Sequence, residues 1–423
     1  MFASRRRRGS TPRPIVWLLA SQLVLSLGVC AMFPFIPLYV RRHGGGAVAV
    51  AVFVAGPLLA NALVQIPAGR LIDRVGRRPV LVVALGCYAL LSGLLALDAG
   101  PLWLLGMLRA GQGIFGGAYN PAMRASIGDL TPPERRAERF GLSQTVFMVG
   151  LLVGPAFGGA LAAISQSLVF LCTAVAAGGA CALVALRVPE TREHGLAAAL
   201  AAGEHHHPQR RAPGAAWWRV RGVLVPMAGL CAMGLVMSMY DVVWPLYLTS
   251  RGQSVVVIGL SITLYAVPLL LLSRSGGRLA DRGNRRVMLA VDFGVAALCA
   301  LSYPWLHALW VILLIGFIEA VSWVATEPIL YAVLTDAVPA QVRGRAMAAG
   351  GFGEYAGSAV GALALGSLYG VGEGIPFWSG SAVLVLAGVV CAVMVPARAV
   401  ASARAARVSA EAAVEAAVPV SVP

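Results

Sequence analysis

The stretch "GRLIDRVGRRPVL", residues 69–81, lies between two long apolar runs, and "GRLADRGNRRVML", residues 277–289, repeats it with few changes. The second copy begins 208 positions after the first and keeps the glycine, the aspartate and the paired arginines in register. Charged residues make up only 12% of the chain, so two charged clusters at matching places indicate a duplicated unit. The sequence therefore predicts two homologous halves, each with this charged loop after its second apolar run.

The composition indicates a membrane protein. Hydrophobic residues make up 59% of the 423 residues and the mean hydropathy is +0.80, more than a soluble core of this length buries. About 20 helical residues cross a bilayer core, and we distinguish twelve apolar runs that meet this length. We expect an all-α polytopic membrane protein whose twelve transmembrane helices form two homologous six-helix bundles.

The basic residues predict the orientation. All 33 are arginines, and most of them lie in the two tails and in every second loop, whereas only Arg41, Arg42 and Arg251 lie in the alternate loops. This asymmetry is the positive-inside bias, and it places both termini in the cytoplasm. It also explains the net charge of +15 without a nucleic-acid partner. We expect a multi-pass protein of a bacterial inner membrane.

The predicted domain organisation follows from the apolar runs. The first run starts at Val16 and is long enough to span the bilayer, and no small-residue cleavage site follows it, so we expect it to be retained. We expect the "EHHHPQ" segment at 204–209 to be solvated, and we expect no metal site there. The segments are a cytoplasmic tail (1–15), a six-helix bundle (16–186), a cytoplasmic linker (187–222), a second six-helix bundle (223–395) and a cytoplasmic tail (396–423).

The repeat extends beyond the charged loops. "NPAMRASIGDLTPPERR" from residue 120 pairs with "EPILYAVLTDAVPAQVR" from residue 327, and "GLLVGPAFGG" from residue 150 pairs with "GSAVGALALG" from residue 357, both at an offset of 207. Because each half has an even number of spans, the halves have the same orientation in the membrane. Repeats of this kind place the binding site at their interface near the bilayer midplane.

These segments resemble the major facilitator superfamily. "GRLIDRVGRR" at 69–78 is similar to its signature loop, "RAGQG" at 109–113 to its fourth-span motif, and "GLLVGPAFGG" at 150–159 to the fifth-span motif of proton-driven exporters. The resemblance covers nearly the whole chain and is strongest to the twelve-span drug:proton antiporters. It implies a secondary active transporter that alternates access between its halves and uses the proton as coupling ion, with spans 1, 4, 7 and 10 around the cavity.

The charged loops are candidate gates. Gly69 permits close helix approach, and Asp73 faces arginines with which it can form an ion network, although the arginines could instead serve topology alone. The resemblance implies that Asp73 contacts the start of span 11 and that Arg77 contacts an acid at the end of span 4, a role that Asp129 fits. Asn284 replaces Gly76 in the second copy, so we expect a looser latch there. The predicted gating residues are Gly69, Asp73, Arg74, Arg77, Arg78, Asp129, Gly277, Asp281, Arg282 and Arg285.

The glycine motif of the fifth span predicts close packing. Gly150, Gly154 and Gly158 share one helical face, with Pro155 and Gly159 beside them. Glycine at every fourth position lets helix backbones touch, and proline removes a helical hydrogen bond. Packing alone explains this pattern, and the exporter interpretation rests on the resemblance.

Acids within the spans are the candidate proton-coupling groups, namely Asp241, Glu319 and Glu327. A charged group at the centre of a span costs roughly 2.5–3.5 kcal/mol and usually marks function. A structural ion pair or a protonated acid inside the second bundle is the alternative. Asp292 and Glu354 lie closer to the cytoplasmic surface and rank below these three.

The cavity walls are predicted from spans 1, 4, 7 and 10. Arg109 and Asp241 lie at similar depths and could face each other across the halves. In span 1 the position that matches Asp241 is Phe33, so proton coupling must use the second half. The predicted wall residues are Gln22, Phe33, Arg109, Gln112, Tyr119, Asn120, Tyr240, Trp244 and Trp323.

The expected function is proton-coupled efflux of a drug-like or metabolite substrate by a monomer. A uniporter or a proton symporter for a sugar or another metabolite is the alternative with the same fold. No enzyme is expected, because the six histidines lie in loops and no catalytic motif is present. No cofactor besides the proton is expected.

Overall fold

The computed structural model describes residues 13–131, 135–191, 221–338 and 343–395, so most of the predicted N-terminal tail and linker and all of the predicted C-terminal tail lie outside the described residues. Every regular element in these ranges is helical. The first half contains α1 (Arg13–Met32), η1 (Phe33–Phe35), α2 (Ile36–Arg42), α3 (Ala47–Val75), α4 (Arg77–Ala96), α5 (Leu102–Asp129), α6 (Arg136–Ile164) and α7 (Gln166–Arg187).

The second half repeats this order. It contains α9 (Arg221–Ser250), α10 (Val255–Arg282), α11 (Arg285–Ser302), η4 (Tyr303–Trp305), α12 (Leu309–Asp336), α13 (Arg343–Val360), the π-helical turn η6 (Gly361–Leu365), η7 (Leu368–Gly370) and α14 (Ile375–Met394). The first span is interrupted at η1, between α1 and α2. Prolines explain this break, because Pro34 and Pro37 lack the amide hydrogen that a continuous helix needs there.

Ten helices among the described residues are long and apolar enough to cross a membrane. The two further expected spans, α5 and α13, are helical but less apolar, because α5 carries Arg109, Gln112 and Arg124 and α13 is rich in glycine and alanine. Both lie inside the bundle, α5 against α3 and α4 and α13 against α9. The twelve expected helices are therefore all present in the part of the chain that the structure describes.

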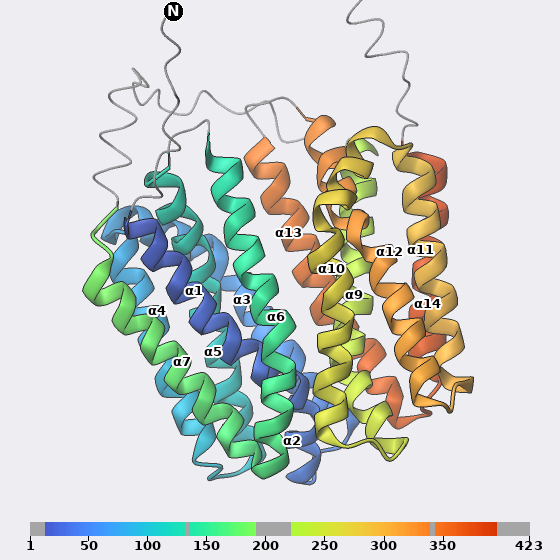
Figure 1. The fold of residues 1–423 in the computed structure, drawn as a ribbon, viewed down its shortest axis with the longest axis horizontal. Coiled ribbons are helices and arrows are strands. Elements are labelled where there is room, and N and C mark those ends of the chain that lie inside the picture. The colour runs from blue at the N-terminus through green and yellow to red at the C-terminus, as the bar shows by residue number, and fades with distance from the viewer. Residues whose placement is uncertain (1–12, 132–134, 192–220, 339–342, 396–423) are drawn as a thin grey trace, which may run out of the picture.

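Helix packing follows the repeat. In the first half α1 packs against α6 and α7, α4 against α5 and α7, and α3 against α5. In the second half the matching helices pack in the same way: α9 against α13 and α14, α11 against α12 and α14, and α10 against α12. Figure 1 shows the two sets of helices side by side. The two six-helix bundles expected from the duplicated loops are thus repeated in three dimensions.

The contact between the halves is also repeated: α6 of the first half packs against α10 of the second, and the equivalent helices α13 and α3 pack against each other. We call the side on which α1 begins and α14 ends the terminal side, and the opposite side the loop side (Figure 1). A Cβ atom on Gly259 would collide with the carbonyl oxygen of Pro155, and one on Gly159 would lie 3.0 Å from the carbonyl oxygen of Val255. These residues lie towards the loop-side ends of α6 and α10, so the halves touch backbone to backbone there.

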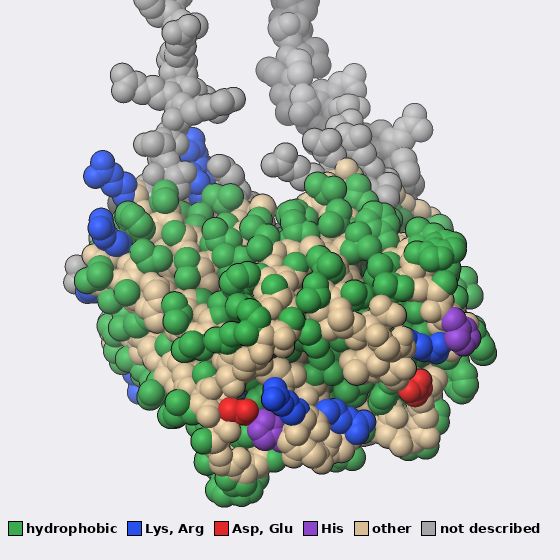
Figure 2. Space-filling view, turned by 60° about the horizontal axis from the view of Figure 1, so that its bottom comes forward, with side chains coloured by type: hydrophobic (Ala, Val, Ile, Leu, Met, Phe, Trp, Pro, Cys, Tyr) green, Lys and Arg blue, Asp and Glu red, His purple; other side chains and the backbone are tan. Residues whose placement is uncertain are grey.

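The outside of the bundle is apolar. Large hydrophobic side chains are exposed along the helices, among them Leu63, Val175 and Leu186, at 72%, 68% and 79% of their full exposure. Figure 2 shows hydrophobic side chains over most of the visible surface and only a few charged groups near the loop side. Such a surface faces lipid rather than water, so the chain is a multi-pass membrane protein.

Candidate functional site

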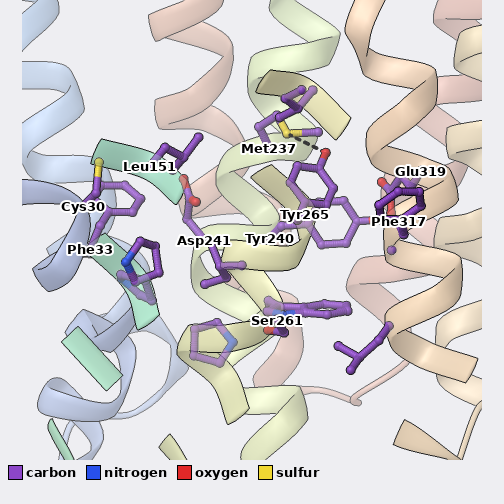
Figure 3. A pocket seen from close by; sticks show the side chains of 18 of the residues that line it. Cys30, Phe33, Leu151, Met237, Tyr240, Asp241, Ser261, Tyr265, Phe317 and Glu319 are labelled. Atoms are coloured by element: carbon purple, nitrogen blue, oxygen red, sulfur yellow. Dashed lines mark hydrogen bonds between the residues drawn. The ribbon is translucent and has the colours of Figure 1, made fainter. Parts of the chain in front are cut away.

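A cavity of about 410 Å³ lies between the two halves. Its first wall comes from α1, η1 and α6, and its second from α9, α10, α12 and η4 (Figure 3). The side chains are mostly apolar or aromatic. The lining residues are Val29, Cys30, Phe33, Pro34, Phe147, Leu151 and Pro155 from the first half and Met237, Tyr240, Asp241, Trp244, Pro245, Ser261, Ile262, Tyr265, Leu269, Tyr303, Leu313, Gly316, Phe317 and Glu319 from the second.

Asp241 faces the first half of the protein. Figure 3 shows its carboxylate between Phe33 and Leu151 on one side and Tyr240 on the other. Ser238, one helical turn earlier on α9, interacts with this carboxylate, and no arginine is among the residues that act on it. Asp241 is therefore an acid in an apolar cavity with no basic counterion among the described residues.

Glu319 lies at the other end of the cavity, beside Phe317 (Figure 3). It is 1% exposed, and its Oε2 accepts a hydrogen bond of 2.7 Å from the hydroxyl of Tyr303. The Tyr240 hydroxyl and the Trp323 indole also surround the carboxylate. Among the described residues, however, Glu319 Oε1, Tyr240 OH and Trp323 Nε1 have no hydrogen-bond partner of good geometry. A proton on Glu319 Oε1 could be donated to the Tyr240 hydroxyl, whereas Trp323 Nε1, which only donates, needs an acceptor such as a polar ligand atom.

Aromatic rings form the second wall. Tyr303 makes edge contacts with the rings of Tyr240 and Trp244, at centroid distances of 6.1 and 5.1 Å. Trp244 Nε1 donates to Ser261 Oγ over 2.9 Å, and the Tyr265 hydroxyl donates to Met237 Sδ over 3.8 Å. Among the described residues, none that lines the cavity is basic. The site is therefore apolar and aromatic, and its ionisable groups include two acids, Asp241 and Glu319.

The expected cavity role of span 4 is wrong. Arg109 and Gln112 are 5% and 1% exposed and are turned into the first half, away from the cavity. Arg109 Nη1 donates to Gln112 Oε1 over 2.6 Å, and Gln112 Nε2 donates to Ser92 Oγ over 2.8 Å. Because the Arg109 charge is held within its own bundle, it does not pair with Asp241 across the halves. Tyr119 packs in the core of the first half, and Asn120 likewise does not line the cavity.

Three other predicted residues also lie outside the cavity. Gln22 connects α1 to α6, because Ser143 Oγ donates to its Oε1 over 2.7 Å and its Nε2 donates to the Ser143 carbonyl over 3.1 Å. Trp323 packs edge-on against Phe293 within the second half. Glu327 is exposed and lies two turns beyond Glu319 towards the terminal side.

The cavity also contains residues that the sequence analysis missed. The main ones are Phe147 and Leu151 on α6, Ser261 and Tyr265 on α10, and Tyr303 of η4. Ser261 and Tyr265 are four residues apart in a strongly apolar run, so the sequence places them on one face of a helix. It does not show which other helix that face contacts. The observed lining comes from spans 1, 5, 7, 8 and 10 and from η4 at the end of span 9.

The two charged loops contain equivalent ion pairs. Arg77 Nε lies 2.9 Å from Asp129 Oδ2, which is the contact expected at the end of span 4. Arg285 Nη1 lies 2.7 Å from Asp336 Oδ2 in the second half, at matching positions of the repeat. Each pair ties the start of the third helix of a half to the end of the fourth. The same contact is therefore present in both halves, and the looser second latch stays a prediction.

The second arginine of each loop also has an equivalent role. An Arg78 side-chain amine donates to the Ala185 carbonyl near the end of α7. Arg286 donates in the same way to the Val395 carbonyl at the end of α14, over 2.8 Å. Carbonyls in the last turn of a helix lack partners, so each arginine caps the sixth helix of its half.

Different residues cap the helices that follow the two loops. Asn284 Oδ1 accepts hydrogen bonds from the amides of Arg286 and Val287 at the start of α11. Gly76 has no side chain, and its φ of 107° favours glycine. The Glu190 carboxylate, from the predicted linker, accepts from the amides of Arg77 and Arg78 instead, over 3.0 and 3.1 Å. Asn284 therefore caps α11 with its own side chain, whereas α4 is capped by Glu190.

Replacing Asn284 with alanine removes the cap of α11, and we expect the protein to lose about 1 kcal/mol of stability. The measurement is the thermal unfolding temperature of the purified protein in detergent. Gln144→Ala is the control, since it removes an exposed amide from the surface of α6. Equal unfolding temperatures for the two variants would contradict the capping role.

Other predicted gating residues are only partly described. Among the described residues, no atom lies within 4 Å of a Cβ built on Gly69, so the expected close helix approach at Gly69 stays a prediction. Arg74 is exposed at the last turn of α3. The side chains of Asp73, Gly277, Asp281 and Arg282 lie outside the described residues, as does the predicted contact of Asp73 with span 11.

The glycine motif packs as predicted. Cβ atoms on Gly150, Gly154 and Gly158 would collide with Ser26, Cys30 and Ala31 of α1, so the two helices touch along this face. The matching Gly357 and Gly361 face the backbone of α9 in the same way. Pro155 and Gly159 lie beside this face and meet α10 of the other half. The motif therefore joins α6 both to its own bundle and to the second one.

The comparisons with known proteins agree on the family. The family model of the Major Facilitator Superfamily matches residues 18–362, and a second match covers residues 226–419. The Pasteurella multocida class H tetracycline resistance protein is 28% identical over 58% of this chain and 60% of its own length. The chain thus matches somewhat less than two thirds of that relative. The Escherichia coli class E protein is 25% identical over 75% of this chain and 80% of its own.

Solved structures share the fold. The inward-open xylose transporter XylE from E. coli superposes with a TM-score of 0.74 and 16% identity, covering 91% of this chain and 96% of its own. A D-xylose-proton symporter gives a TM-score of 0.71 at 18% identity, over 90% of this chain and 98% of its own. At this identity the likeness concerns the fold alone.

Proposed function

Because the chain belongs to the major facilitator superfamily, we propose that it is a secondary active transporter that exports amphipathic cations in exchange for protons. The observation that carries this proposal is the cavity between the halves, with two acids, aromatic walls and no basic residue. Relatives named for tetracycline and quinolone resistance support efflux of drug-like molecules. The proton is the only coupling ion in this proposal, and no catalytic activity is expected.

The aromatic wall and the acids favour a cationic substrate. A cation over an aromatic face gains about 0.5–2 kcal/mol, and more when water is excluded. Asp241 and Glu319 add negative charge at the two ends of the cavity. Arg109, which could have held an anion, is turned into the first bundle instead. An anionic substrate would therefore find acids and no counter-charge in the cavity lining.

In the proposed mechanism protons and substrate compete for the two carboxylates. When the cavity faces outside, Asp241 and Glu319 take up protons, and the substrate leaves. When the cavity faces the cytoplasm, the protons are released and the cation binds to the ionised acids. Each proton that moves inward down the membrane potential supplies about 2.3 kcal/mol per 100 mV.

The arginine distribution supports an inner-membrane protein with both termini in the cytoplasm. On the terminal side the described loops and helix ends carry Arg70, Arg74, Arg78, Arg135 and Arg187, whereas Arg41, Arg42 and Arg251 lie on the loop side. The terminal side is then cytoplasmic. A single chain forms the whole cavity, which supports a monomer as the working unit.

A uniporter or sugar symporter is the alternative, and it has the same fold as the D-xylose-proton symporter. A sugar presents many hydroxyl groups, and a site for it needs several side chains that form hydrogen bonds. Most of the described lining is apolar, and its hydrogen-bonding side chains are mainly the tyrosines, Ser261 and the two acids. The cavity therefore favours an apolar cation over a sugar.

The test uses proteoliposomes with an imposed proton gradient and a pH-sensitive dye inside. Pairs of compounds with similar apolar area, one cationic and one neutral, are added one at a time, and empty liposomes serve as control. We expect the cation of a pair to dissipate the gradient and the neutral partner to leave it intact. Equal fluxes of neutral sugars or organic acids, or substrate movement without protons, would contradict the proposal.

A further inference from the structure

A chain of hydrogen bonds reaches Glu319 from the loop side of the second half. Tyr303 belongs to η4, the short turn between α11 and α12, and its hydroxyl donates to Glu319 Oε2 over 2.7 Å. Tyr303 is 1% exposed, and its ring contacts the rings of Trp244 and Phe377 at centroid distances of 5.1 and 5.5 Å. The ring cannot move freely, so the position of η4 determines where the hydroxyl meets Glu319.

Two side chains at the loop-side end of α9 hold η4 in place. The Tyr247 hydroxyl donates to the carbonyl oxygens of Tyr303 and Leu306, over 2.7 and 3.2 Å. Arg251, the residue after α9, donates through Nη2 to the Pro304 carbonyl over 3.0 Å. The Arg251 guanidinium also lies 5.0 Å from the centroid of the Tyr247 ring, as a cation–π contact. Three carbonyl oxygens in and directly after η4 are therefore bound to side chains from the end of α9.

Tyr247 acts on the site only through this turn. It is fully buried, and it is not among the described residues that line the cavity. Its ring packs on Phe377 of α14, as the ring of Tyr303 does. Phenylalanine would make the same ring contact, so the hydroxyl is what distinguishes Tyr247, and its two acceptors are carbonyls of η4 and the residue that follows it.

The hydrogen bond from Tyr303 makes the two oxygens of the Glu319 carboxylate unequal. Oε2 is occupied, whereas Oε1 has no hydrogen-bond partner of good geometry among the described residues. The last torsion of a glutamate side chain is broad, so the carboxylate turns easily unless a donor fixes one of its oxygens. A donor held on Oε2 therefore also determines where Oε1 points.

We propose that Tyr247 is a positioning residue for Glu319. By holding η4 it keeps the Tyr303 hydroxyl on Oε2, and Oε1 is then the oxygen that takes up the proton or binds the cation. The inference rests on the transport function proposed above. Tyr247 lies six residues after Asp241 on α9, so the helix that carries one cavity acid also positions the other.

A purely structural role for Tyr247 makes a different prediction. Its hydrogen bonds would then only stabilise the loop-side end of the second half, and Tyr247→Phe would unfold at a lower temperature with Glu319 unchanged. The positioning role requires a change at Glu319 in a protein that is still folded. It also requires that the effect of Tyr247 passes through the Tyr303 hydroxyl.

The test is infrared difference spectroscopy of the purified full-length protein between acidic and alkaline pH, which needs no substrate. The C=O band of protonated Glu319 is the one that Glu319→Gln lacks. A carbonyl that loses a hydrogen-bond donor absorbs at higher wavenumber. We therefore expect the band to move to higher wavenumber in Tyr303→Phe, and in the same direction but less far in Tyr247→Phe.

A double variant and a control complete the spectroscopic test. Tyr247→Phe/Tyr303→Phe should show the band where Tyr303→Phe alone shows it, since one residue that acts through another adds nothing once the second is lost. The control is Tyr369→Phe, which removes a loop-side hydroxyl that lies 3.4 Å from Ser250 Oγ, outside the cavity lining. Its band should match the wild type.

The binding of tetraphenylphosphonium, a lipophilic cation, measures the consequence for a substrate. When Oε1 is no longer directed by the bond on Oε2, the carboxylate meets the cation less well. We expect the dissociation constant to rise about fivefold in Tyr303→Phe, the effect of one hydrogen bond, and less in Tyr247→Phe. Equal binding by Tyr369→Phe and the wild type is the expected control result.

A wild-type band in Tyr247→Phe would overturn the positioning role, and so would an equal shift in Tyr369→Phe. A double variant whose shift is the sum of the two single shifts would overturn it as well, because Tyr247 would then act independently of Tyr303. The spectrum does not depend on the transported compound. Hence a protein that shows the expected shifts, yet binds and exports no cation, would refute the proposed function and leave the positioning role standing.

Discussion

Replacing Asp241 with asparagine abolishes proton-coupled transport, while the protein still folds and inserts. Asparagine keeps the size of the side chain and its contact with Ser238, but it cannot take up and release a proton. Asp241 is the acid that the cavity presents to the first half, and no basic residue lines the cavity to replace its charge change. We expect the flux of protons driven by a transported cation to fall to that of protein-free liposomes.

The matched control is Asp292→Asn. Asp292 is also an acid within a span, but it accepts a hydrogen bond of 3.0 Å from Thr326 on α12 and does not line the cavity. This variant should keep coupled transport. Export by Asp241→Asn with the pH dependence of the wild type would exclude Asp241 as a coupling group, and equal losses in both variants would indicate a general effect of removing buried acids.

Replacing Gly158 with alanine strongly destabilises the first half. A Cβ atom at this position would overlap the carbonyl oxygen of Ala31 on α1, and a backbone atom cannot turn aside as a flexible side chain can. Overpacking of this kind costs about 1–3 kcal/mol, so the unfolding temperature in detergent should fall by several degrees and the yield of folded protein should drop.

Gly141→Ala is the control on the same helix. Among the described residues, a Cβ at Gly141 meets no atom within 4 Å, so alanine there should leave the unfolding temperature unchanged or raise it slightly. If both variants unfold at the wild-type temperature, α6 and α1 do not touch at Gly158, and the glycine motif needs another explanation.

Much of the fold could be predicted because its signals are repeated. The two charged loops at 69–81 and 277–289 share one register, and the apolar runs between them set the number of helices. The same register predicts equivalent contacts, and the structure contains them: Arg77 with Asp129 and Arg285 with Asp336. Only the first of these pairs was expected, although the repeat itself implies the second.

The site was harder to predict, because a helical period identifies a face but not its neighbour. Arg109 and Gln112 share a polar face of α5, and polar groups in a membrane need either a cavity or each other. The sequence analysis placed these residues in the cavity, whereas in the structure Arg109 Nη1 donates to Gln112 Oε1 within its own bundle. Neither Asp241 nor Glu319 has an arginine three or four residues away on its own helix, and both acids line the cavity.

The capping of α4 by Glu190 changes where the first half ends. Composition assigns residues 187–222 to a linker, yet Glu190 binds the first amides of α4, and Thr191 Oγ1 lies 3.4 Å from Asp129 Oδ2. In the second half the corresponding cap is Asn284, which directly precedes α11. A transporter expressed as two separate chains should therefore be divided after Thr191, since a cut at Arg187 would leave the first chain without the acid that caps its own terminal-side loop.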